Sequence, residues 1–180
     1  MRIRNYRQQD LPTLVQIQQE AAQADGCELQ NADSIEEWLT NSEMDALSNA
    51  FVIMDDDDEL NTWGQAGTLD SLEGEIVGYT TLELRQDQHA YHLLCQGAVH
   101  PQYRRQNAGR LLLVGALNRA RIMGTEFEFE AEQEGTPVYF EALLPVRDPA
   151  SPRLAAKCEM QPTNEDSPED MRLYRRELWL

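Results

Sequence analysis

The sequence of 180 residues lacks the features of several protein classes. Its three cysteines (Cys27, Cys95, Cys158) are an odd number without a CxxC pair, which disfavours a disulfide framework or a cysteine-built zinc site. No apolar run approaches the roughly 20 residues that a membrane-spanning helix needs, and the N-terminus shows no secretory signal. We therefore expect a cytoplasmic protein with reduced thiols and no membrane partner.

Positive charge is scarce, with 15 Lys and Arg against 32 Asp and Glu and a formal net charge of −17. Nucleic-acid binding needs a basic face and is therefore not expected. Residues 88–125 are the exception, because they contain no acid but hold all three histidines and five arginines, Arg104, Arg105, Arg110, Arg119 and Arg121. This electropositive segment favours a compact anion such as a phosphate ester.

A metal site has little support in the sequence. The five consecutive acids at 55–59 lack the spaced pattern of a calcium loop, so a solvated loop is the favoured interpretation. The histidines form neither HxxxH nor HExxH, the usual zinc spacings on a helix. We expect no metal.

Hydrophobic periodicity predicts strands at 2–6, 50–54 and 75–85, a strand from 89 or 91 to 99, and strands at 127–129 and 171–180. Helices are predicted at 11–24 with Asp10 as N-cap, after Ser34 as N-cap, at 108–123 and at 153–158. Residues 131–148 stay open, with a helical turn as one interpretation of 137–144. This order predicts a single domain over 1–180 of α+β or mixed α/β class.

The segment 97–112 carries the chemistry. A strand ends at Val99, a polar loop follows, and a helix begins near Ala108, so free backbone N–H groups face the loop at the positive end of the helix dipole. Such a nest binds pyrophosphate. Asn107 is of a residue type that enters the left-handed region at low cost, and Gly109 permits close backbone approach.

This run resembles motif A of the GNAT superfamily of N-acetyltransferases, V-x-P-x-[YW]-[RQ]-x-x-G-x-[GA]-x-x-L. The matching positions are Val99, Pro101, Tyr103, Arg104, Gly109 and Leu112, whereas Asn107 stands at the first motif glycine. The flanks are also similar to the family, at 10–12, 75–79 and 154–160.

The resemblance implies a GNAT-like acyl-CoA N-acyltransferase fold, with a central, mostly antiparallel mixed sheet flanked by helices. It also implies an acyltransferase that uses acetyl-CoA as cosubstrate and acetylates a primary amine. The positions that it assigns to cofactor binding are Gly97, Ala98, Val99, Arg104, Arg105, Gln106, Asn107, Ala108, Gly109 and Arg110.

The resemblance places the N–H that polarises the thioester at Val99, but gives no catalytic side chain. The position of the family's glutamate base holds Leu93, and that of its tyrosine acid holds Ala155. Near the position of the base, Glu83 on the preceding strand and His92 are the candidates to accept the proton, directly or through water. Tyr139, elsewhere in the irregular segment, is the candidate for the acid, although its spacing gives no support for that role.

The acidic composition favours a cationic amine, on a small molecule or a peptide, as acceptor, and a homodimer is among the assemblies that the sequence allows. Two alternatives stay open. One is a non-catalytic acyl-CoA-binding domain, favoured by Leu93 and Ala155. The other is an interaction module, suggested by the apolar stretch 138–146 and by Trp179.

Overall fold

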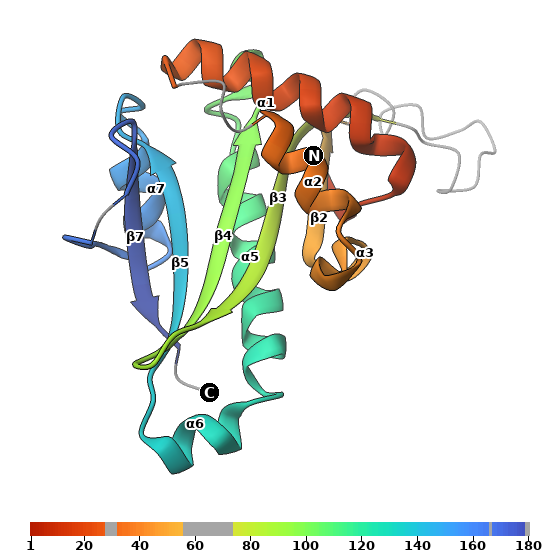
Figure 1. The fold of residues 1–180 in the computed structure, drawn as a ribbon. Helices are drawn as coiled ribbons and strands as arrows, with labels where there is room; N and C mark the ends of the chain where they lie inside the picture. The colour runs from red at the N-terminus through yellow and green to blue at the C-terminus, as the bar shows by residue number, and fades with distance from the viewer. Residues whose placement is uncertain (28–31, 56–73, 166, 179–180) are drawn as a thin grey trace, which may run out of the picture.

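The computed structural model describes residues 1–27, 32–55, 74–165 and 167–178, in which the strands form one sheet of order β1-β2-β3-β4-β5-β7-β6 (Figure 1). The strands are β1 (Arg2–Asn5), β2 (Ala50–Asp55), β3 (Glu75–Gln86), β4 (Tyr91–Val99), β5 (Val138–Pro145), β6 (Gln161–Pro162) and β7 (Met171–Glu177). The helices are α1 (Leu11–Asp25), α2 (Ala32–Thr40), α3 (Ala46–Asn49), α5 (Ala108–Gly124), α6 (Glu128–Glu134) and α7 (Ser151–Lys157).

Neighbouring strands in this sheet are antiparallel, except that β4 and β5 run parallel. A parallel pair needs a long crossover, which α5 and α6 supply here. The mixed α/β class and the mostly antiparallel sheet predicted from the sequence are confirmed.

Helices cover both faces of the sheet. On one face α1 and α2 bury Leu14, Ile17 and Leu39 against Val52 and Tyr79. On the other face α5 and α7 pack on β3, β4 and β5, in a core that includes the fully buried Leu93 and Phe140. Alternate residues of a strand point to opposite faces, so each central strand serves both layers.

The predicted helix at 108–123 is confirmed as α5, which begins after Asn107 and ends at Gly124. Asp10 precedes α1 as predicted, but its side chain makes no bond to the first turn of that helix. The Asp10 carboxylate instead accepts the backbone N–H of Arg7 and a two-pronged pair from Arg4, at 2.7 and 2.9 Å. Asp10 therefore ties β1 to the start of α1.

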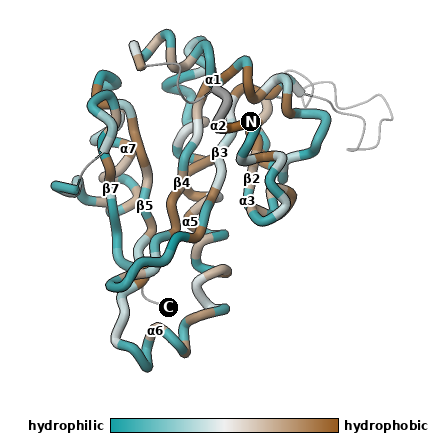
Figure 2. The backbone as a smooth tube through the Cα atoms, in the orientation of Figure 1, coloured by the Kyte–Doolittle hydropathy of each residue, from teal (hydrophilic) through white to brown (hydrophobic). Residues whose placement is uncertain are grey.

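The strand predicted at 127–129 is wrong, because residues 128–134 form the helix α6. Alternating Phe and Glu suggested a strand, but acids in the first turn of a helix favour its positive end, and Gly135 ends α6 in the left-handed conformation. Phe127 precedes α6 and stacks on Tyr91, with ring centroids 4.5 Å apart. Figure 2 shows α6 as mostly hydrophilic, at the end of the molecule.

The helical turn considered for 137–144 is also wrong, because these residues belong to β5 apart from Pro137. The helix predicted after Ser34 begins at Ala32 instead. The short late helix is α7 and the closing strand is β7, both near their predicted positions. Residues 56–59 of the acidic tract and Trp179 lie outside the described residues. No helix among the described residues is long and apolar enough to cross a membrane.

The core predicts a contrast between two phenylalanines. Phe140 is fully buried, so Phe140→Ala should lower the free energy of unfolding by about 3–5 kcal/mol. Phe129 on α6 is 70% exposed, so Phe129→Ala should change that free energy by less than about 0.5 kcal/mol. Urea unfolding followed by circular dichroism measures both, and equal losses would contradict the described core.

Candidate active site between two diverging strands

The parallel strands β4 and β5 stop pairing before either strand ends. Their ladder runs from Tyr91 and Val138 to Cys95 and Ala142, whereas β4 continues to Val99 and β5 to Pro145. Beyond Cys95, the edge of β4 that would face β5 pairs with no strand of the described residues. Figure 1 shows the two strands separating toward the end where α1 crosses the sheet.

The direction of the main chain follows from two hydrogen bonds. The N–H of Tyr91 donates to Pro137 beside β5, and the N–H of His100 donates to Val77 on β3. Because these directions alternate along a strand, the N–H and C=O groups of Gly97 and Val99 face the gap. The carbonyl of Gln96 agrees with this assignment, since it accepts the Thr80 hydroxyl of β3 at 2.9 Å.

Gly97 marks a close approach of β4 to β3. A Cβ atom built on Gly97 would overlap the carbonyl oxygen of Tyr79 and lie 2.9 Å from the Cα of Thr80. Backbone atoms cannot move aside as a flexible side chain can, so this position requires glycine. The sequence indicated a role for Gly97 only through the family motif, and the geometry adds a physical reason.

A cavity of about 360 Å³ fills the gap between the strands. Its walls come from residues 95–99 of β4, residues 142–145 of β5, the first turns of α5, and α7. Ala21 and Asp25, near the end of α1, also line it. The cavity is thus bounded by both layers of helices.

The loop from Arg104 to the start of α5 forms an array of free N–H donors. Arg105 and Asn107 both have a φ of 69°, which confirms the left-handed conformation predicted for Asn107. Among the described residues, no partner accepts a hydrogen bond from the backbone N–H groups of 105–110. These donors gather at the N-terminus of a 17-residue helix, where the helix dipole is positive. Free N–H donors at the positive end of a helix are chemically complementary to an anion.

The arginines predicted to join this site differ in their partners. Arg104 forms a two-pronged ion pair with Asp25, at 2.6 and 2.9 Å, and its Nε donates to the carbonyl of Val99. Arg105 is more than half exposed and bonds Asp148 at 2.7 Å. Arg110 is exposed, lines the cavity and forms no ion pair with a described residue. The side chain of Arg104 is therefore already occupied.

Two further cations, Arg153 and Lys157 on α7, line the same cavity. Neither residue was predicted from the sequence. Their signal is weak, because nothing in the local pattern shows that α7 lies across the gap from α5. Gln106 and Ala108 complete the loop, and only Ala108 is buried.

The three candidates for proton transfer lie away from the cavity lining. Glu83 on β3 forms a two-pronged pair with Arg85, at 2.9 and 3.0 Å. His92 and Tyr139 lie near the start of β4 and of β5, with ring centroids 6.0 Å apart, and the guanidinium of Arg175 lies 4.5 Å above the Tyr139 ring. The structure brings His92 and Tyr139 together, but on the open sheet face below α1.

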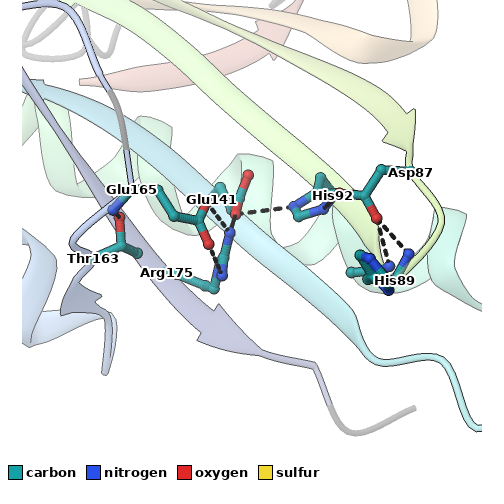
Figure 3. A network of polar contacts seen from close by, with 8 residues as sticks. Asp87, His89, His92, Glu141, Thr163, Glu165 and Arg175 are labelled. Atoms are coloured by element: carbon teal, nitrogen blue, oxygen red, sulfur yellow. Dashed lines mark hydrogen bonds and ion pairs between the residues drawn. The ribbon is translucent and has the colours of Figure 1, made fainter.

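A polar network on that face includes Glu141, which the sequence analysis missed (Figure 3). The buried Glu141 carboxylate contacts Nδ1 of His92 at 3.0 Å and accepts from Nε of Arg175 at 2.6 Å. Nε2 of His92 contacts Asp87 at 3.2 Å. Two backbone N–H groups of the β3–β4 turn lower the pKa of Asp87. Glu141 stands one residue before Ala142, the last residue of β5 that pairs with β4.

The thiol in the cavity is unsuited to covalent catalysis. Cys95 lines the cavity and lies 3.1 Å from the Thr80 hydroxyl, and burial raises its pKa to about 12. A thiol that stays protonated is a poor nucleophile. No group of three or more His, Cys, Asp or Glu among the described residues could hold a metal ion.

Comparisons with known proteins agree with the geometry. The family model described as the acetyltransferase (GNAT) family matches residues 19–139. No curated protein sequence matches the chain.

Three solved structures show the likeness of fold, each at 15–16% sequence identity. A phosphinothricin acetyltransferase from Sinorhizobium meliloti in complex with acetyl-CoA has a TM-score of 0.63 and covers 98% of this chain and 88% of its own. The ribosomal-protein-S18-alanine N-acetyltransferase from Escherichia coli has a TM-score of 0.60, covering 99% and 94%. For a GCN5-related N-acetyltransferase from Sphaerobacter thermophilus the TM-score is 0.59, and the match covers 89% of this chain but only 43% of that one.

Two glycines of the site should respond oppositely to alanine. Gly97→Ala should destabilise the fold by about 1–3 kcal/mol, because its Cβ meets backbone. At Gly109 a Cβ would make only ordinary contacts at 3.6 and 3.8 Å, so Gly109→Ala should leave the melting temperature unchanged or raise it. Thermal melts test both, and a tolerated Gly97→Ala would contradict the close approach of the strands.

Proposed function

The chain belongs to the acetyltransferase (GNAT) family, and on that premise we propose that it transfers an acetyl group from acetyl-CoA to a primary amine. The observation that carries the proposal is a convergence of main-chain groups on one cavity. The free edge of β4 and the N–H array of 105–110 both border it. Acetyl-CoA combines an amide-bearing arm with a pyrophosphate, and the two features are complementary to these two parts.

The pantetheine arm would continue the sheet. Gly97 offers its N–H and C=O and Val99 its N–H on the free edge of β4, and amides of an extended chain can pair with such an edge as a strand does. Leu112, Leu113 and Leu144 supply apolar walls to the same cavity. Extended binding there would satisfy main-chain groups that β5 leaves unpaired.

The pyrophosphate would lie against the N-terminus of α5. Its oxygens would accept from the N–H groups of 105–110, which have no partner among the described residues. Arg105 and Arg110 add positive charge from the same loop, and Arg153 and Lys157 add it from α7. We propose that Gln106, Asn107, Ala108 and Gly109 take part through their backbones.

In the reaction the neutral amine nitrogen attacks the thioester carbonyl carbon. A C–N bond forms, the C–S bond breaks, and the electron pair leaves on the sulfur of CoA. The N–H of Val99 faces the gap, and in this proposal it stabilises the charge that develops on the carbonyl oxygen. Holding amine and thioester together in the cavity supplies much of the remaining rate enhancement.

For the proton of the amine we propose the pair Glu141 and His92, acting through water. Glu141 lies on the same face of β5 as Leu143, which lines the cavity about 7 Å further along the strand. The carboxylate of Glu141 contacts the imidazole, which leads toward solvent at Asp87. Glu83 pairs with Arg85, Arg175 covers the ring of Tyr139, and neither side chain shares a hydrogen bond with His92 or Glu141, so we assign them no step.

The acceptor would approach over the open sheet face, and we propose that it is cationic. Glu165, more than half exposed, stands at the outer end of the network on this face, and the chain carries a net charge of −17. The field of such a chain attracts cations and raises their rate of encounter. The acceptor class includes polyamines, aminoglycosides and peptide N-termini.

A second candidate is a non-catalytic acyl-CoA-binding domain. The positions of the family's base and acid hold Leu93 and Ala155, and both side chains are fully buried in the core. Neither can transfer a proton. If the wild-type protein binds acetyl-CoA but turns over none of a broad panel of amines, this second candidate is favoured.

The double variant Arg105→Gln, Arg110→Gln should bind CoA about tenfold to a hundredfold more weakly than wild type, because it removes two charged contacts to the pyrophosphate. Calorimetric titration at low salt measures the change. The control is Arg121→Gln, which changes a charge of the same helix in its last turn, away from the cavity. Equal affinities of the double variant and the control would contradict the proposed phosphate site.

Diamines and polyamines should have a higher kcat/KM than monoamines of equal length, and raising the salt from about 0.02 M to about 0.5 M should shrink the ratio. Long-range attraction by the acidic chain is screened at the higher ionic strength. A thiol-release assay with acetyl-CoA gives both rates. If the ratio of kcat/KM for polyamines to that for monoamines does not change with salt, charge does not select the acceptor.

A further inference from the structure

We infer that Asp25 is a positioning residue for the cofactor site, and that Arg104 acts with it as a brace on β4 rather than as a phosphate ligand. The inference rests on the proposed function, in which CoA lies in the gap between β4 and β5. It assigns a role to a residue that lies 79 positions from Arg104 in the sequence and belongs to no motif.

The brace joins three elements through one guanidinium. Nη1 and Nη2 of Arg104 donate to the two carboxylate oxygens of Asp25, at 2.6 and 2.9 Å, and Nε donates to the carbonyl of Val99 at 3.1 Å. Every donor nitrogen of the side chain therefore has a partner. Planar, two-pronged pairing of this kind fixes geometry as well as supplying energy.

The position of Asp25 disfavours a carboxylate, and the ion pair with Arg104 offsets this cost. Asp25 is the last residue of α1, at the negative end of the helix dipole, and it is 8% exposed. A carboxylate is disfavoured both by that end of a helix and by burial. Gly26 then ends the helix in the left-handed conformation. A neutral residue would suit the helix better, so the charge at this position serves Arg104.

The brace acts where the site is assembled. The Val99 carbonyl belongs to the free edge of β4, and Arg104 directly precedes Arg105, the first left-handed residue of the N–H array. Fixing Arg104 therefore fixes the end of the strand and the start of the array together. Asp25 lines the same cavity, so α1 holds the site in place from the opposite layer.

The two roles of Arg104 predict effects of opposite sign. If Arg104 bound phosphate, Asp25→Asn would remove a competing carboxylate and release a cation, and CoA would bind more tightly. If Arg104 is a brace, Asp25→Asn removes the ion pair and leaves the guanidinium held mainly by the carbonyl of Val99, and CoA binds more weakly. Arg104→Lys separates charge from geometry, because lysine keeps the charge but cannot make both contacts at once.

The chain offers a matched control at the other end of α1. Asp10 is 4% exposed and forms a two-pronged pair with Arg4, at 2.7 and 2.9 Å. Neither residue lines the cavity. Asp10→Asn thus removes the same kind of buried pair from the same helix, and reports what loss of stability alone does to CoA binding.

The experiment is calorimetric titration of CoA into five proteins, with melting temperatures to show that each is folded. They are wild type, the single variants Asp25→Asn, Arg104→Lys and Asp10→Asn, and the double variant that combines Asp25→Asn with Arg104→Lys. We expect about tenfold weaker binding for Asp25→Asn and for Arg104→Lys, with no further loss in the double variant. Asp10→Asn should lower the melting temperature but bind CoA as wild type does.

Different results overturn different claims. Binding by Asp25→Asn or Arg104→Lys as tight as wild type or tighter overturns the brace and leaves the proposed function standing. An equal loss of affinity in Asp10→Asn assigns the effect to general stability and also overturns the brace. No binding of CoA by folded wild type overturns the proposed function itself.

Discussion

The structure depends on one constraint, the end of pairing between β4 and β5 after Cys95 and Ala142. Polar main-chain groups at a strand edge need partners, and beyond Cys95 the exposed Gly97 and the half-buried Val99 turn theirs away from any neighbouring strand among the described residues. Here the edge faces a cavity, and α1, α5 and α7 are arranged around it. Gly97 allows β4 to keep close to β3 while it turns away from β5.

The segment 88–125 is electropositive in the sequence, but in the folded protein two of its arginines are neutralised by carboxylates. Arg104 and Arg105 are paired with Asp25 and Asp148, so the acids absent from the local sequence are supplied by distant elements. Arg119 bonds the side chain of Asn49. The proposed anion site therefore depends mainly on backbone N–H groups, which carry no net charge and suit a chain with a net charge of −17.

The sequence predicts those parts of the site whose determinants are local. Asn107 in a left-handed position, the start of α5 and the end of β4 all follow from residue types within one short stretch. The alternation of Phe and Glu at 127–129 gave a wrong strand prediction. Alternation indicates a strand only when every second residue is buried, and Phe129 is exposed.

β5 was not predicted because Pro137 precedes it and Pro145 ends it, although prolines at the ends of a strand leave its ladder intact. Asp25 and Lys157 could not be predicted, since each lines the cavity only through the packing of α1 and α7 around the sheet. The contact of Glu141 with His92 likewise depends on the pairing of β4 with β5.

Backbone amide exchange, resolved by residue with and without CoA, tests the central claim most directly. If CoA pairs with the free edge of β4 and its pyrophosphate sits on the array, the amides of Gly97, Val99 and 105–110 gain protection when CoA is added. Amides of β4 that already bond to β3, such as Gln96 and Ala98, should change little. Protection elsewhere in the chain, with none at Gly97, Val99 and 105–110, would contradict the account.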